Sequence, residues 1–177
     1  MAKWIIRIAA LILLGVSFVL ILLVLHKPNV PVVEVSADAS RSFDEKMAYL
    51  VLAQERRLPA EIRLTEAEIN SKIQEALKSN PPPPAAVTLK GATVLLQGEK
   101  LLAVLMVSAK GVELQVAVAG SLDFSNHTLR LIPSEVHVGS LPVPASWLQG
   151  RLDMHMEIPA AVTAMRVENG ELVVEAH

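Results

Sequence analysis

The sequence contains no cysteine, which excludes disulfides, thiolate nucleophiles and cysteine-ligated metals. The chain must therefore be stable through an ordinary packed core. Aromatic residues make up only 3% of it, which argues against stacking platforms for bases or sugars and predicts an aliphatic core. A charge excess is also lacking: the net charge is -2 with acids and bases interspersed, so no basic surface is available for nucleic acid.

One long apolar run stands near the N-terminus, from Ile8 to Leu25. At about 1.5 Å per residue it forms roughly 27 Å of helix, close to the roughly 30 Å hydrocarbon core of a bilayer. The run is longer than a cleaved secretory signal requires. Lys3 and Arg7 precede it, and this small bias predicts that the N-terminus lies inside. We therefore predict an uncleaved, single-pass transmembrane signal anchor over residues 1–27.

The predicted orientation places everything after this segment outside a bacterial cytoplasmic (inner) membrane. Pro28 and Pro31 disfavour helix in the residues before them, so 28–41 is predicted to be an extended tether. The remaining 42–177 suits a single extracytoplasmic domain with one core.

Two helices are predicted in the first part of that domain. Ser42 or Asp44 can cap a helix over about 43–57, where apolar residues recur at helical spacing before Pro59 ends it.

The second helix has the clearest local signal in the chain. Thr65 as N-cap places Glu68 at the third helical position for a capping box, and Leu64 can pack on Ile69 as a hydrophobic staple. These residues predict a helix over about 66–78.

Strands are predicted from about residue 86, after the proline run 81–84. Apolar stretches alternate there with turn signals at 98–100, 110–111, 125–128 and 168–171. Short turns of this kind join antiparallel strands, and Asn169-Gly170 supplies the positive φ that a tight hairpin needs. The sequence therefore predicts an α+β domain with an antiparallel sheet.

Two motifs carry a resemblance to a known family. The first contains Leu64, Thr65, Glu68 and Asn70, and the second contains Val138, Gly139, Leu141, Pro142 and Pro144. With the N-terminal apolar segment before them, they resemble the YpmS-like single-pass bacterial envelope proteins over roughly Leu64 to Leu152.

The resemblance implies a long, curved antiparallel sheet associated with helices, similar to tubular domains that hold an acyl chain along an apolar groove. The predicted fold class is thus α+β: an N-terminal transmembrane helix, then two helices packed on a long curved antiparallel β-sheet. The family offers no established activity.

Catalytic and metal sites have little support in the sequence. Glu135 with His137, and Asp153 with His155, each fall on one face of a predicted strand and together resemble zinc ligands. Solvent-facing polar residues on half-exposed strands explain both pairs more simply. No phosphate loop, nucleophile elbow or zinc-protease helix is present. We therefore predict no enzyme activity and assign no catalytic, cofactor or metal residue.

Apolar contacts are the remaining candidates. Strands that are aliphatic on more than one face, including Leu105 and Val107, could line a cavity. A sheet buried on both sides would have the same pattern. A second set, at positions Leu141, Val143, Trp147 and Leu148, could form an exposed apolar lip that touches a ligand, a membrane or a partner, or a short helix that closes the core.

The leading hypothesis is a membrane-anchored extracytoplasmic domain that binds or chaperones lipid-like apolar ligands at the cell envelope. The alternative is a structural or interaction subunit of an envelope assembly, with a protein partner and no ligand cavity. A hydrolase with metal at His137 and His155 is the third and weakest hypothesis.

Overall fold

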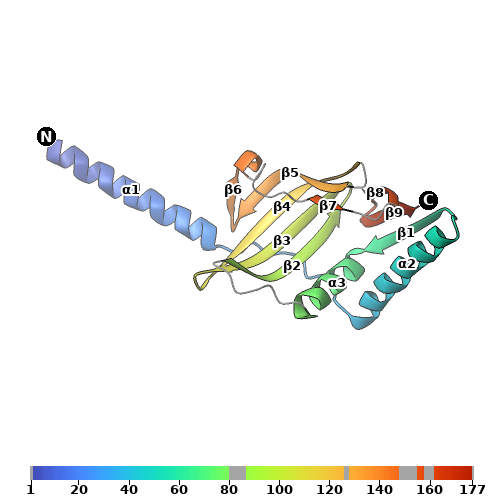
Figure 1. Ribbon diagram of the computed structural model, residues 1–177. Helices are drawn as coiled ribbons and strands as arrows, with labels where there is room; N and C mark the ends of the chain where they lie inside the picture. Colours follow the sequence, from blue (N-terminus) through green and yellow to red (C-terminus); the bar gives the residue numbers. More distant parts are fainter. Residues whose placement is uncertain (1, 80–86, 126–127, 148–154, 158–161, 177) are drawn as a thin grey trace.

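The computed structural model describes residues 2–79, 87–125, 128–147, 155–157 and 162–176, with side chains from residue 14 onward except 87, 147 and 155–157. Within these residues the chain is α+β, with helices at both ends of the view in Figure 1 and two antiparallel sheets between them. The helices are α1 (Ala2–Leu25), α2 (Ala37–Glu55) and α3 (Glu66–Ser79), with a short 3-10 helix η1 (Ala145–Trp147).

The strands form a small sheet and a long sheet. The small sheet has the order β1-β9-β8, and the long sheet has the order β2-β3-β4-β5-β6, with β7 also paired to β5. Their bounds are β1 (Ala60–Thr65), β2 (Val87–Gln97), β3 (Lys100–Ala109), β4 (Val112–Ser125), β5 (Thr128–Val138), β6 (Leu141–Val143), β7 (His155–Glu157), β8 (Val162–Glu168) and β9 (Glu171–Ala176).

The predicted transmembrane helix is not supported by the structure. Among the residues with described side chains, no helix has both the length and the apolar character needed to cross a membrane. This part of the fold prediction was wrong.

Helix α2 begins six residues before the predicted 43–57 and ends at Glu55. Its N-cap is Ser36, whose hydroxyl accepts a hydrogen bond from the Ala39 N–H at 3.0 Å. At the other end the Leu58 N–H bonds to the Ala53 carbonyl at 2.9 Å, with Arg57 in the left-handed region at φ 53°. This pattern is a Schellman ending, which stops the helix before Pro59 does. The predicted tether 28–41 is consequently non-helical only up to residue 36.

Helix α3 confirms the predicted capping box. The Glu68 N–H donates to the Thr65 hydroxyl at 3.3 Å, and the Thr65 N–H donates to the Glu68 carboxylate at 2.8 Å. The staple residues Leu64 and Ile69 belong to the same apolar cluster. Local sequence therefore determines where α3 starts.

The prediction of one sheet was also wrong. Strand β1, directly before α3, pairs with β9 at the end of the chain, from Ala60 opposite Ala176 to Thr65 opposite Glu171. The strand Ala60–Thr65 lies outside the predicted strand region, which began at about residue 86. Its partner is more than a hundred residues away, so no hairpin turn announces the pairing.

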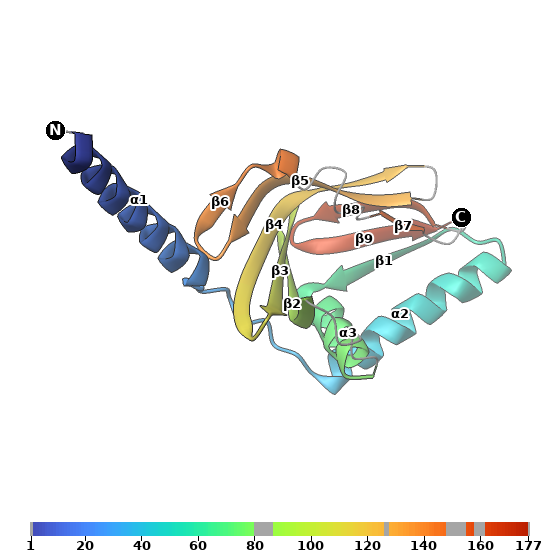
Figure 2. The same ribbon diagram turned by 60° about the vertical axis from the view of Figure 1, so that its left-hand side comes forward.

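The long sheet is a curved layer in Figures 1 and 2. One of its faces, the apolar face, is lined by aliphatic residues. Paired residues of an antiparallel sheet point to the same side, as do alternate residues of one strand. Two neighbouring rows on this face are Ala92, Leu105, Val116, Val138 and Leu141, and then Val94, Ala103, Val118, Val136 and Val143. Val118 and Val136 are buried, and the other eight are half-buried.

The opposite face of the long sheet is crossed by the segment after α1. Val30, Pro31 and Val33 line a small hollow together with Thr93, which points to this opposite face. Ser36 at the end of the segment donates its N–H to the Ser71 hydroxyl of α3 at 3.1 Å. The predicted tether therefore lies against the domain.

Candidate apolar binding site

The apolar site is built where α2 covers the small sheet. Register places Ile62, Val174 and Met165 side by side on one face of that sheet, with Ala60, Ala176 and Val162 in another row. Helical spacing brings Phe43, Met47 and Leu50 onto the side of α2 that contacts this face. Leu50, Ile62 and Val174 are 3–5% exposed and form the centre of the core cluster.

A cavity of about 330 Å³ remains between these two layers. Gln54 is the only polar residue among the described residues that line it. The lining set is Phe43, Met47, Leu50, Val51, Gln54, Leu64, Ile69, Leu129, Val162, Met165, Leu172, Val174 and Ala176. Such walls offer dispersion contacts and removal of apolar surface from water, and they offer neither a nucleophile nor an acid–base pair.

The apolar walls of the cavity continue into the apolar face of the long sheet, as the pairing of β4 with β5 shows. Leu129 of β5 lines the cavity and pairs with Phe124 of β4, which packs on the core cluster. Two residues earlier on β4, Leu122 pairs with Leu131 on the same face. Towards the N-terminal end of β4 the same face continues to Val118. The aliphatic surface thus extends from the cavity to the rows that end at β6.

The predicted apolar contacts lie at the other end of this surface. Leu105 and Val107 are on β3, and Leu141 and Val143 are on β6. Register brings Leu105 and Leu141 into one row of the apolar face, and Val143 into the next. None of the four lines the cavity.

The structure does not describe the side chains of the other two predicted contact residues. Trp147 is the last residue of η1, and its side chain lies outside the described part of the structure. Leu148 lies entirely outside the described residues.

Sequence reasoning missed the cavity because its walls come from distant segments. The apolar spacing of Met47, Leu50 and Val51 is visible in the sequence and marks one side of α2. The pairing of β1 with β9 supplies the opposite wall, and no local pattern indicates it.

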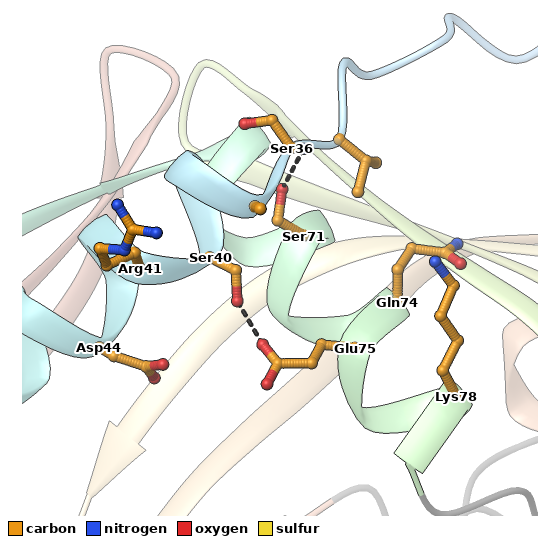
Figure 3. Close-up of a pocket in the computed structure, with 10 residues that line it drawn as sticks. Ser36, Ser40, Arg41, Asp44, Ser71, Gln74, Glu75 and Lys78 are labelled. Carbon is orange, nitrogen blue, oxygen red and sulfur yellow. Dashed lines mark hydrogen bonds between the residues drawn. The ribbon is translucent and has the colours of Figure 1, made fainter.

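A polar cleft of about 520 Å³ lies between the start of α2 and α3 (Figure 3). Its side chains bond mainly to each other: Ser40 donates to the Glu75 carboxylate, and Lys72 bridges Glu75 at 3.1 Å and Asp44 at 2.8 Å. The hydrogen bonds from Ser40 and Lys72 lower the pKa of Glu75. These contacts connect the two helices and present no arrangement of nucleophile and base.

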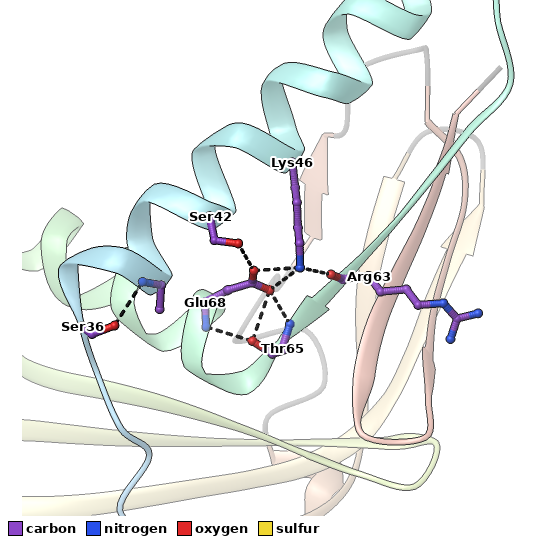
Figure 4. A network of polar contacts seen from close by, with 7 residues as sticks. Ser36, Ser42, Lys46, Arg63, Thr65 and Glu68 are labelled. Atoms are coloured by element: carbon purple, nitrogen blue, oxygen red, sulfur yellow. Dashed lines mark hydrogen bonds and ion pairs between the residues drawn. The ribbon is translucent and has the colours of Figure 1, made fainter.

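A second polar cluster joins α2 to the start of α3 (Figure 4). Glu68 is 5% exposed and accepts from Ser42 at 2.5 Å, from Lys46 at 2.7–2.8 Å and from the Thr65 N–H. Burial alone raises the pKa of Glu68, but the hydrogen bonds from Lys46, Ser42 and Thr65 outweigh it and lower the pKa to about 2. Lys46 also donates to the Arg63 carbonyl at 2.6 Å. Glu68 is a structural carboxylate that stays ionised.

The zinc hypothesis is not supported by the strand register. His155 of β7 pairs with Arg130 near the start of β5, whereas His137 lies near its end, opposite Pro142. Seven residues of strand separate these positions, about 23 Å. Asp153 lies outside the described residues. Among the side chains that are described, no group of three histidines, aspartates or glutamates could hold a metal.

Comparisons of the chain with family models, curated proteins and solved structures find no match.

Proposed function

We propose that this domain binds a lipid-like ligand with an apolar chain, which enters the cavity between α2 and the small sheet. The observation that carries the proposal is the composition of the cavity walls, which are aliphatic or aromatic at every described position except Gln54. Its volume of about 330 Å³ falls within the range of small-molecule sites, about 300–1,000 Å³.

The energetics favour a chain over a polar ligand. Each methylene group transferred from water to apolar walls contributes about 0.8 kcal/mol. A polar group in the same place would lose its water partners, and among the described lining side chains it would find a polar partner only in the Gln54 amide. We therefore expect the polar end of the ligand to remain at the surface.

The apolar face of the long sheet extends the proposed site. Its residues around Leu105 and Leu141 are half-buried, so part of their surface is still available for contact. A ligand longer than the cavity would continue from Leu129 and Phe124 along this face.

A structural or interaction subunit is the second candidate function. It is favoured by apolar residues on the outer side of α2, where Tyr49, Leu52 and Leu58 are each about half exposed around a hollow of about 360 Å³. An envelope location, with a membrane or an envelope protein as partner, stays a prediction from the sequence, and neither candidate function depends on it.

Two adjacent positions on α2 allow a matched test. Val51 lines the cavity and is 52% exposed, whereas Leu52 is 51% exposed and does not line it. Val51→Trp should fill the mouth of the cavity with little cost to folding, and Leu52→Trp adds the same bulk outside it. The purified full-length chain and both variants are extracted with organic solvent, and the extracts are analysed by mass spectrometry.

We expect the unaltered chain and Leu52→Trp to release the same acyl-chain compound, and Val51→Trp to release much less of it. Equal amounts from both variants would refute the cavity as the site. A chain that yields no lipid and also fails to bind added fatty acid would leave the interaction subunit as the better explanation.

A further inference from the structure

The turn at Gly139 and Ser140 contacts the C-terminal end of α1. The Ser140 N–H donates to the Leu23 carbonyl at 2.8 Å. The last carbonyls of a helix have no partner within the helix, so this bond satisfies one of them from a distant part of the chain. The Gly139 N–H donates to the Gln115 carbonyl at 2.7 Å, which ties the same turn to β4.

Glycine is required at position 139 for two reasons. Its φ of +60° lies in the left-handed region, which other residues rarely adopt. A Cβ atom there would also lie 2.2 Å from the Val24 carbonyl oxygen and 2.5 Å from that of Leu23. The backbone of α1 therefore approaches the turn as closely as a residue without a side chain permits.

Two contacts just after the helix strengthen this attachment. Lys27 forms an ion pair with Glu113 of β4 at 2.8 Å, and the hydrogen bond from Lys27 lowers the pKa of Glu113. Gln115, which is 4% exposed, donates its side-chain amide to the Pro28 carbonyl at 3.4 Å.

We propose that Gly139, Ser140, Gln115 and Glu113 form a rigid socket for the end of α1, so that the helix and the domain keep one relative orientation. Figures 1 and 2 show α1 leaving the molecule beside β6, while α2 and the small sheet lie at the opposite end. The socket thus holds the apolar cavity at the end of the domain away from α1. It also assigns a physical role to the Gly139 position of the second sequence motif.

The absence of cysteine makes this geometry directly measurable. Leu14→Cys on α1, which is 70% exposed, and Ser121→Cys on β4, which is also exposed, introduce the only two thiols of the full-length chain. Both are spin-labelled, and the distance distribution is measured by pulsed electron resonance. The test variant is Gly139→Ala. The matched control is Gly98→Ala, because Gly98 has a similar φ of +63° but nothing within 4 Å of an added Cβ.

We expect a single narrow distance in the unaltered background and in Gly98→Ala, and its loss or broadening in Gly139→Ala. A broad distribution in the unaltered background would overturn the proposal without any variant. A narrow distance that survives Gly139→Ala unchanged would also overturn it. If Gly139→Ala does not fold, slow hydrogen exchange at the Ser140 amide of the unaltered chain supports the socket, and rapid exchange there refutes it.

Discussion

The side chain of Asn70 bonds to both backbone polar groups of Val94. Its amide nitrogen donates to the Val94 carbonyl at 2.6 Å, and its amide oxygen accepts from the Val94 N–H at 2.7 Å. The same nitrogen donates to the Glu66 carbonyl at 2.8 Å. Two residues along, the Leu96 N–H donates to the Glu66 carboxylate at 2.5 Å. Strand β2 is an edge strand of the long sheet, so side chains of α3 take the place of a missing neighbour strand.

Replacing Asn70 with Val should lower the free energy of unfolding by about 3 kcal/mol, because three hydrogen bonds are lost and their backbone partners in Val94 and Glu66 are partly buried. Urea denaturation measures the loss. Gln74→Val, one turn later on α3 and half-buried, is the control and should change stability far less. Equal losses of unfolding free energy at both positions would show that the hydrogen bonds of Asn70 do not stabilise the fold.

The ionised state of Glu68 should make stability depend on pH. Its pKa of about 2 in the folded chain lies below the ordinary 4.5, so ionisation of this group stabilises the fold above about pH 4.5. The contribution, about 3 kcal/mol from a shift of this size, should be lost as the pH falls from 4.5 towards 2.

Unfolding free energies of the unaltered chain and of Glu68→Gln, measured from pH 7 to pH 2, check this dependence. The gap between the two should be largest at neutral pH and should close at the acid end. Glu99→Gln in the exposed turn after β2 serves as the control. A gap of constant size across the range would contradict the prediction.

A charge placed in the cavity should abolish ligand binding. Met165 lines the cavity, so Met165→Glu introduces a carboxylate among walls whose described residues are apolar except for Gln54. We expect the affinity for a fluorescent fatty acid such as cis-parinaric acid to fall by at least about tenfold, or 1.4 kcal/mol. Thr163→Glu, at an exposed position of the same strand, should bind as the unaltered chain does. Equal affinity of the two variants would exclude this cavity.

Replacement by alanine should change stability differently at two glycines of the long sheet. A Cβ on Gly120 would lie 2.3 Å from the Ile132 carbonyl oxygen, at the bulge between β4 and β5, whereas a Cβ on Gly91 would meet only the Met106 Cβ at 3.8 Å. Gly120→Ala should therefore destabilise by about 2 kcal/mol or more, because the strands must separate. Gly91→Ala should be neutral or slightly stabilising. Thermal unfolding measures the stability of both variants. If Gly120→Ala loses no more stability than Gly91→Ala, the strands accommodate a Cβ at position 120 without cost.

Local signals in the sequence determined several elements correctly. The capping box at Thr65 and Glu68 places the start of α3, and Asn169-Gly170 forms the predicted turn, with φ values of 53° and 79°. Residues a few positions apart supply all the interactions involved, so a single stretch of sequence is sufficient. The earlier start of α2 was missed because Ser36, Ser42 and Asp44 are all acceptable N-caps.

The sequence by itself therefore determined an aliphatic α+β chain with a reliable α3, antiparallel hairpins and no thiol chemistry. Only the tertiary structure decided that β1 joins β9 in a second sheet, that residues 28–36 lie on the long sheet, and that α2 encloses an apolar cavity. It also placed Leu105 and Leu141 in one row, although the sequence proposed them separately. The physical reason is that caps and turns depend on neighbours along the chain, whereas sheet register and cavities depend on contacts between segments far apart in sequence.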